Sequence, residues 1–227
     1  MEVQALKKGR IVDLSHRLRA GKERFKLEID TFFVDEYLPG FKRIQDDWYV
    51  MQEVHMCSHV GTHIEAPLHH LKEGRDAAGI SLERLIGEAI VLDFSHKKAN
   101  ESIDVQELEK VGQNVKEGDI VLIKTGLSKF YNTPNYRRPY LAKEAVKWLV
   151  DRRVSCIGVD CSGIEKLDEE GQPNHRIIFE NDIPLIEDLN NLEQLRQERV
   201  FLIVLPLKIE GLDASPVRVI AIEGIED

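Results

Sequence analysis

The sequence of 227 residues predicts an α/β fold in one compact domain that spans residues 1–227. Runs rich in Val, Ile and Leu alternate along the chain with segments that repeat apolar residues at helical spacing, as in proteins that combine strands and helices. The composition, 42% hydrophobic and 31% charged, is ordinary for a protein with one sizeable core. No repeat or Gly/Ser-rich linker marks a boundary between domains.

The expected strands are short apolar runs bounded by turn residues. In chain order they are RIVDLS (10–15), DWYVMQEVHM (47–56), EAIVLDF (88–94), DIVLIKT (119–125), VSCIGVD (154–160), VFLIVLPL (200–207) and PVRVIAI (216–222). Helices are expected between them, at SLERLIG (81–87), DVQELEKV (104–111) and LAKEAVKWLVDRR (141–153). In the last of these, Ala145, Trp148 and Leu149 fall near one face of a helix.

Charge and apolar run length exclude two classes of partner. The chain has 40 acidic and 31 basic residues, a net charge of −9 that repels phosphate backbones, so no nucleic acid partner is expected. The longest apolar runs are far shorter than the roughly 20 residues that span a bilayer, so no membrane partner is expected. Three cysteines are too few for a disulfide framework, and the first residues lack a secretory signal, so we expect a cytoplasmic location.

Histidine is concentrated in one short part of the chain. Five of the eight histidines fall within 16 residues, namely His55, His59, His63, His69 and His70. From Glu53 onward, odd positions carry mostly polar ligand types and even positions mostly apolar residues. This period of two is typical of a strand that is buried on one side and lines a site on the other, whereas a helix would scatter His59, His63 and Glu65.

The spacing of this cluster suits a metal ion only if the chain bends. In a straight strand the Cα atoms of His59 and His63 would lie roughly 13 Å apart, too far for two imidazoles that each bind an ion at about 2.0 to 2.1 Å. Gly61 lies midway and can adopt the positive φ of a bend, and Pro67 favours a strand that breaks into a loop. The pattern His-x-x-x-His-x-Glu then offers two nitrogens and one anionic oxygen, which suit zinc, manganese or iron.

The other histidines of the cluster admit more than one role. His69 lies four residues after Glu65 and can be a fourth ligand or a nearby base. His55 and His70 are expected to face away or to assist from outside the ligand set. The alternative for the whole cluster is a set of surface or core histidines with ordinary hydrogen bonds, but the density of the cluster favours a metal site.

The stretch HVGTHIEAPLHH (59–70) resembles the signature His-x-Gly-Thr-His-x-Asp-x-Pro-x-His of the metal-dependent cyclase-like hydrolases, which include bacterial kynurenine formamidases and isatin hydrolases. The resemblance continues in order through IVDLS (11–15), LIKTG (122–126), YLAKEAVKWLV (140–150), IGVD (157–160), HRIIFENDIPLIEDLNNLEQL (175–195) and LPLKIEGLDASPVRVIA (205–221). It implies a swivelling β/β/α cyclase-like fold with a mixed sheet, a small-molecule substrate and a homo-oligomer, a dimer or a tetramer. It also implies one or two divalent ions per chain, zinc or manganese.

The resemblance also implies roles for individual residues. The implied metal ligands are His59, His63, Glu65, His175 and Glu187. His59, His63 and Glu65 would hold the first ion, with Glu65 able to bridge to a second. His175 and Glu187 would complete a second site or cap the first, and His69 would be the proton shuttle. Spacing alone would not select His175 and Glu187, which by themselves read as a helix-start histidine and a surface carboxylate.

The chain departs from the family pattern at three places. Glu65 replaces the usual aspartate, and its extra methylene moves the carboxylate outward by about one bond, which puts bridging of two ions in doubt. Leu127 follows Thr-Gly where many relatives have tryptophan, and residues 17–43 lack a Pro-rich aromatic turn. We expect both regions to line the substrate pocket, so the substrate is not transferred from the relatives.

The expected reaction is hydrolysis of a carbon–nitrogen bond in a small amide, formamide or cyclic amide, with lactone or ester hydrolysis as the alternative. A divalent ion activates water for attack on a carbonyl, and His69 would take the proton and return it to the leaving nitrogen. Two other functions are weighed against this one. Cys161 could be a nucleophile if a base approaches it, and the chain could be a family member that binds metal without turnover.

Overall fold

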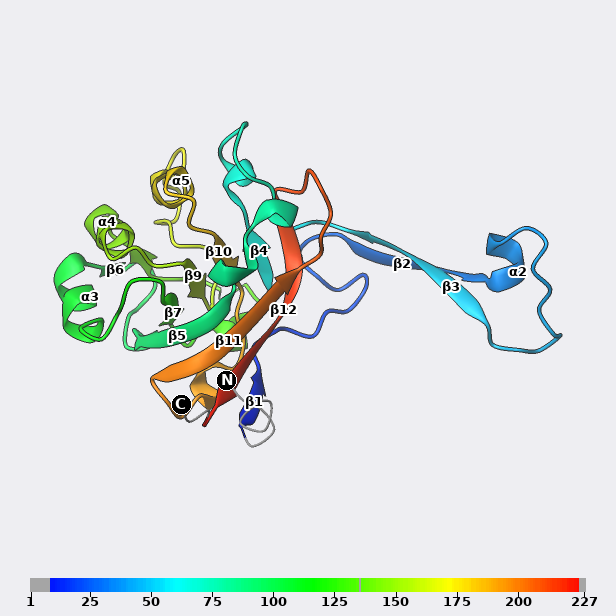
Figure 1. Ribbon diagram of the computed structural model, residues 1–227, viewed down its shortest axis with the longest axis horizontal. Coiled ribbons are helices and arrows are strands. Elements are labelled where there is room, and N and C mark those ends of the chain that lie inside the picture. Colours follow the sequence, from blue (N-terminus) through cyan, green and yellow to red (C-terminus); the bar gives the residue numbers. More distant parts are fainter. Residues whose placement is uncertain (1–8, 135, 225–227) are drawn as a thin grey trace.

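The computed structural model describes residues 9–134 and 136–224. Its body is a sheet that curls into a barrel, with helices packed against one side and a long hairpin projecting from the other (Figure 1). The eight strands of the sheet are β1 (Arg10–Asp13), β4 (His63–Glu65), β5 (Ile86–Asp93), β7 (Ile120–Lys124), β9 (Cys156–Val159), β10 (Leu185–Glu187), β11 (Arg199–Pro206) and β12 (Ala214–Glu223). The prediction of an α/β fold with a mixed sheet is confirmed.

The strand order closes the sheet on itself. The order is β1-β12-β11-β5-β7-β9-β10-β4, and β12 also pairs with β4, so that all strands except β1 form a closed ring. The pairs from β5 through β7 and β9 to β10 are parallel, and the remaining pairs are antiparallel. Closure leaves β4, a strand of only three residues, hydrogen-bonded on both sides.

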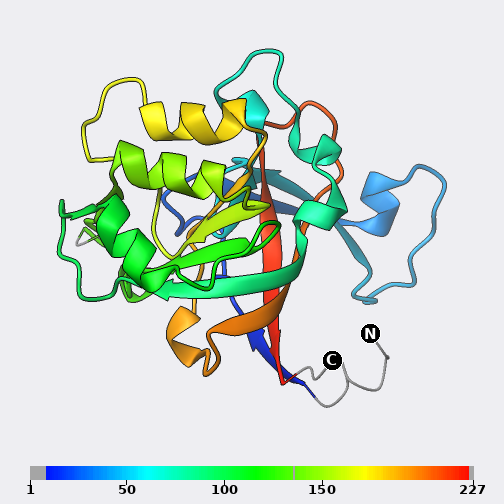
Figure 2. The same ribbon diagram turned by 60° about the vertical axis from the view of Figure 1, so that its left-hand side comes forward.

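Two apolar clusters fill the body, one on each face of the sheet. Successive residues of β7 alternate between them: Ile120 and Leu122 belong to the cluster inside the barrel, whereas Val121 and Ile123 pack with the helices. These helices are α3 (Val105–Val111), α4 (Lys143–Asp151) and α5 (Pro173–Glu180), which Figure 2 shows on one side of the sheet. The parallel strands are buried on both faces, which explains their continuous apolar runs.

Strands β2 (Leu27–Phe33) and β3 (Val50–Met56) form the projecting hairpin, and α2 (Val34–Tyr37) lies near its tip (Figure 1). We call residues 25–56 the arm. Most of the exposed large apolar side chains of the described residues lie on the arm, including Ile44 and Trp48, which are 76% and 79% exposed. Because these side chains are exposed, the arm buries little apolar surface of its own. A two-stranded hairpin of this kind is only marginally stable by itself in water. The short strands β6 (Ser102–Ile103) and β8 (Tyr140–Leu141) pair separately.

Most expected elements are present, and one is wrong. The helices expected at 104–111 and 141–153 are α3 and α4, and the seven expected strands overlap observed ones. The helix expected at 81–87 is instead a single 3₁₀ turn, Leu82–Arg84, after which β5 begins at Ile86. Ile86 and Gly87, the last two residues of the expected helix, pair with β11 and so belong to the sheet, which leaves only a single turn before them. The domain bounds of 1–227 stay a prediction.

Candidate metal centre

Strand β4 brings together residues that are far apart in the sequence. It lies between β10 and β12, and its register places His63 directly opposite Glu187. Because neighbouring residues of a strand face opposite sides, His63 and Glu65 share the face on which Glu187 also lies. All three side chains are buried. The pairing of two short strands therefore explains how Glu187 reaches the histidine cluster.

The chain bends before β4, as the ligand spacing requires. Gly61 has a φ of +70°, which is strained for other residues, and a Cβ at this position would lie 2.3 Å from a methyl group of Leu18, which would have to move. The bend brings the rings of His59 and His63 to 5.0 Å between centroids. His59 thus lies beside the face of β4, although it belongs to the preceding loop. The predicted bend at Gly61 is confirmed, but the predicted strand does not run through His59, because β3 ends at Met56 and β4 begins at His63.

Helix α5 supplies His175 from the opposite side. Its Nε2 lies 3.5 Å from Glu65 Oε2 and 3.5 Å from Glu187 Oε1. The backbone N–H of His175 donates to Glu165 Oε1, which lies 2.8 Å away, so Glu165 fixes the first turn of the helix. Pro173 at the start of α5 has a φ that suits a first helical turn. The structure therefore places His175 and Glu187 next to Glu65.

Each of four histidines has its Nδ1 atom bound to another group. The partners are the Gly61 carbonyl oxygen for His63 (2.8 Å), Ser58 Oγ for His59 (3.0 Å), Glu165 Oε1 for His175 (3.0 Å) and Asp213 Oδ2 for His69 (3.0 Å). Ser58 Oγ itself donates to Asp213, so it accepts from His59. Carbonyl and carboxylate oxygens only accept hydrogen bonds, so all four Nδ1 atoms carry the proton. In the neutral ring, Nε2 then carries a lone pair that can bind a metal ion.

These Nε2 atoms face carboxylate oxygens, which are also acceptors. Glu65 Oε1 lies 3.3 Å from His59 Nε2, 3.6 Å from His63 Nε2 and 3.8 Å from His69 Nε2. Among the described buried atoms, His59 Nε2, His63 Nε2 and Glu65 Oε2 lack any hydrogen-bond partner. Buried acceptors that face one another are unfavourable unless a cation lies between them. These residues therefore fit a divalent metal ion.

The carboxylates and histidines of the cluster shift one another's pKa values toward their charged forms. Burial alone would lower the pKa of His63, but contact with Glu65 and the charge of Glu187 outweigh it and raise that pKa to about 9. Burial is likewise outweighed at His175, where Glu165 and Glu187 raise the pKa to about 10. Burial alone would raise the pKa of Glu65, but His59, His63 and His175 hold it well below its usual value. The cluster thus attracts positive charge, which a proton or a metal ion can supply.

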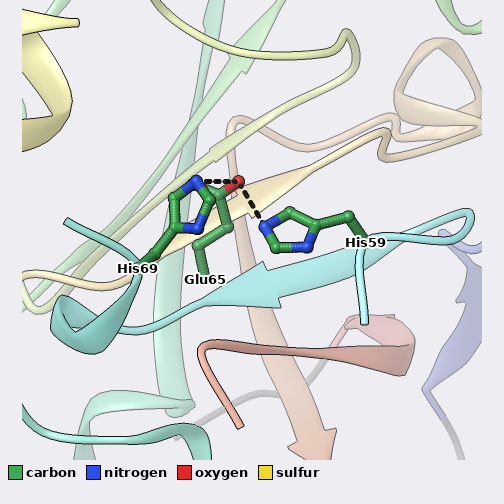
Figure 3. A group of neighbouring side chains, drawn as sticks. All are labelled: His59, Glu65 and His69. Atoms are coloured by element: carbon green, nitrogen blue, oxygen red, sulfur yellow. Dashed lines mark ion pairs between the residues drawn. The ribbon is translucent and has the colours of Figure 1, made fainter. Parts of the chain in front are cut away.

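Two groups of ligand atoms are compact enough to hold an ion, and both contain Glu65. One is His59, Glu65 and His69, which Figure 3 shows converging on the Glu65 carboxylate, and the other is His63, Glu65 and Glu187. Within each group, the ligand atoms lie within 4.8 Å of one another. Glutamate at position 65 is therefore long enough to reach both groups. This geometry favours bridging of two ions by Glu65, which the extra methylene had put in doubt.

Neither His55 nor His70 belongs to a compact ligand group: His55 lies away from the cluster, and His70 packs beside it. His55 is exposed on the arm, beside Asp30 and Glu53, and His70 Nε2 contacts Gln172 while its ring stacks on His175.

Cys161 is fully buried, and burial raises the pKa of its thiol well above the usual value. A buried thiol of this kind stays protonated and is a poor nucleophile, so the structure does not favour a cysteine hydrolase.

Sequence reasoning missed Asp213 and Glu165, the two carboxylates that orient His69 and His175. Asp213 lies in the loop between β11 and β12, within the LPLKIEGLDASP segment that carried part of the resemblance. Glu165 has no comparable local signal. Such carboxylate partners set the tautomer of a ligating or catalytic histidine, so both belong to the site.

The candidate ligands line a cavity of about 510 Å³ that Arg24, Phe25, Tyr136 and Arg138 also line. The expectation for residues 17–43 is met in part, because Arg24 and Phe25 come from that segment. Leu127 is not among the residues that line this cavity. Leu127 packs against the apolar cluster under the helices, because the backbone N–H groups of the preceding Thr-Gly pair donate to Asp160 and hold the turn there.

A sequence model of the family described as "Putative cyclase" matches residues 12–166, more than half of the chain. The chain belongs to this cyclase family. A kynurenine formamidase of Erythrobacter litoralis is 32% identical over 167 residues, which cover 73% of this chain and 73% of the relative. The resemblance seen in the histidine motif is therefore confirmed.

Solved structures of a predicted metal-dependent hydrolase and an isatin hydrolase have the same fold. A predicted metal-dependent hydrolase from Bacillus stearothermophilus aligns with a TM-score of 0.76 at 28% identity, covering 95% of this chain and 98% of the other. Isatin hydrolase A from Ralstonia solanacearum aligns with a TM-score of 0.78 at 25% identity, covering 97% and 94%. The cyclase-like fold and the prediction of a metal-dependent hydrolase are confirmed. No described helix is long and apolar enough to cross a membrane.

Proposed function

We propose that this cyclase-family chain hydrolyses the carbon–nitrogen bond of a small amide, formamide or cyclic amide, with a divalent metal ion bound at the histidine cluster. The observation that carries the proposal is the set of buried Nε2 and carboxylate atoms that face one another without hydrogen-bond partners. The named relatives, a kynurenine formamidase and an isatin hydrolase, support the same class of bond.

The proposed ligands divide between two adjacent positions. His59 and Glu65 would hold one ion, and His63, Glu65, His175 and Glu187 would hold a second. The bound ion would lower the pKa of water and polarise the substrate carbonyl. Zinc or manganese suits this mixture of nitrogen and oxygen ligands. Glu65 belongs to both positions, so we expect two ions per chain.

His69 has the geometry of a proton shuttle. Its Nδ1–H donates to Asp213 Oδ2, which leaves Nε2 as the proton acceptor on the cavity side. His69 is half-buried, whereas His63 and His175 are fully buried, so it remains accessible to a substrate. In this arrangement Nε2 accepts a proton from water and returns it to the leaving nitrogen, while Asp213 stabilises the charged ring.

The metal content and the reaction can be tested together. We expect two equivalents of zinc or manganese per chain, by elemental mass spectrometry on tag-free protein purified without added metal. We also expect turnover of formanilide or another simple aromatic formamide, which stops on chelation and returns when metal is restored. Protein that stays metal-free after reconstitution with both metals would refute the proposal, and one equivalent would refute the bridging role of Glu65. Metal-loaded protein that cleaves esters but no amide would favour the alternative, lactone or ester hydrolysis.

We propose that the chain forms a homo-oligomer through the arm. The arm carries a group of exposed apolar side chains, which include Phe41, Ile44, Trp48 and Tyr49. Exposed apolar surface of this kind is typical of a protein–protein interface, and closed homo-oligomers are the commonest assemblies. A second copy of the chain would cover this surface. We also expect the protein in the cytoplasm, as the reduced cysteines favour.

Charged substitutions on the arm should therefore weaken self-association. In sedimentation velocity, wild-type protein should sediment as a species larger than the 26.0 kDa chain. The double variant Ile44→Asp/Trp48→Asp should have a dissociation constant at least about 100-fold higher, because each charge would be buried in the interface. Leu82→Asp, an exposed apolar position outside the arm, is the matched control. A wild-type monomer would contradict the proposal.

A further inference from the structure

The cavity at the candidate metal centre extends toward a second one. A neighbouring cavity of about 400 Å³ shares Arg24, Phe25, Tyr136 and Asp188 with it, so the two are adjacent. The inner part is acidic because it holds the carboxylates of the proposed ligands. The wall of this first cavity carries positive charge from Arg24 and Arg138, of which Arg24 also lines the second cavity. A substrate that reaches the metal centre therefore contacts a cationic wall.

Arg138 is held in a fixed position on this wall. It is half-buried, and its Nε donates to the Gly163 carbonyl oxygen at 2.9 Å. Gly163 has a φ of +100°, and a Cβ there would lie 3.0 Å from Arg138 Nη2 and 3.1 Å from Glu187 Oε1. Glycine thus leaves room for the end of the guanidinium group to lie close to the proposed ligand Glu187. The reactive centre and Arg138 are therefore near enough to contact one small molecule.

The guanidinium group of Arg138 has donors to spare. Within the described part of the chain, it forms no ion pair and no side-chain hydrogen bond other than the one to Gly163. Its acidic neighbours have other roles: Glu187 is a proposed metal ligand beside His63 and His175, and Asp188 accepts from the Tyr136 hydroxyl. A half-buried cation costs desolvation energy unless an anion pairs with it. The planar guanidinium fork fits a carboxylate, with which it forms two parallel hydrogen bonds.

We propose that Arg138 is a specificity-determining residue that binds a carboxylate of the substrate, so that this enzyme prefers small amides with an anionic group near the scissile bond. Phe25 and Tyr136 line the same cavity and favour an aromatic ring in that substrate. Arg24, exposed at the junction of the two cavities, adds attraction at longer range. This inference rests on the proposed amide hydrolysis.

A pair of matched substrates tests the role of Arg138. N-formylanthranilate carries a carboxylate beside the formamide, and formanilide is the same compound without it. We expect wild-type enzyme to prefer N-formylanthranilate, and Arg138→Gln to lower kcat/KM for it by about 10- to 100-fold while changing that for formanilide less than about 3-fold. Arg137→Gln removes the same charge from the next residue, which is exposed and outside the residues that line either cavity, and should change neither value. An equal loss on both substrates would overturn the proposal, because it would mean that Arg138 acts through Glu187.

Binding of the product separates this inference from the proposed function. Anthranilate is fluorescent, so its Kd for metal-loaded protein can be measured by titration. We expect Arg138→Gln, but not Arg137→Gln, to raise that Kd at least 10-fold. An unchanged Kd, or no binding to wild type, would overturn the role of Arg138. If anthranilate binds in this way but neither formamide is hydrolysed, the proposed function fails and the carboxylate site stands.

Arg138→Gln also loses the hydrogen bond to Gly163 and can lose stability. Arg138→Lys loses that bond too but keeps the charge, and circular dichroism shows whether either variant folds. We expect Arg138→Lys to keep only part of the preference for N-formylanthranilate, because an ammonium group does not form the paired bonds. A preference in Arg138→Lys equal to that of wild type would overturn recognition by the guanidinium fork.

Discussion

Glu65→Gln should leave the protein folded and nearly free of metal. Glutamine has the shape of glutamate, but it removes the one anionic group that belongs to both compact ligand groups. Loss of an outer-shell partner costs about 10- to 100-fold in metal affinity, so loss of this direct ligand should cost more than about 100-fold. Equilibrium dialysis against zinc and manganese, followed by elemental mass spectrometry, measures the effect. Turnover should fall with the metal content.

Two variants control this experiment. Glu180→Gln removes an exposed carboxylate from the end of α5 and should bind as much metal as wild type. Glu65→Asp introduces the residue that is usual in the family motif and should keep at least one ion. Metal content in Glu65→Gln equal to that of wild type would contradict the assignment of Glu65 as a ligand, whatever the activity.

His69→Ala should retain its metal and lose turnover by about 10²- to 10⁴-fold, the range for loss of a general acid–base group. The reason is that His69 presents an unprotonated Nε2 to the cavity while Asp213 holds its other nitrogen. Metal content and kcat measured on the same sample decide the result. His96→Ala, which removes an exposed histidine far from the cluster in sequence, should leave both unchanged.

The same experiment distinguishes the two roles that the sequence allowed for His69. His69 forms a compact group with His59 and Glu65, so a ligand role predicts loss of metal in His69→Ala. Asp213→Asn provides a second test, because it keeps an acceptor oxygen but removes the charge that stabilises the protonated ring. For a proton shuttle we expect a loss of about 10- to 100-fold in kcat with metal retained, and a shifted pH profile.

The sequence by itself determined the chemical types and the local geometry of the site. The period of two around His63 and Glu65, the glycine between His59 and His63, and the density of histidines predicted a bent strand with metal-binding side chains. Strand and helix periodicity likewise predicted the α/β class and most elements. These features are local, because a few neighbouring residues set the backbone conformation and the direction of each side chain.

The meeting of distant residues was decided by the tertiary structure. Glu187 reaches His63 only because β10 and β4 pair in one register, and a shift by one residue would turn it to the other face. His175 approaches from a helix packed outside the sheet, and Asp213 comes from a loop near the other end of the chain. No local pattern encodes such contacts, since they depend on closure of the whole barrel. The position of Arg138 beside Glu187 and the projection of the arm are outcomes of the same kind.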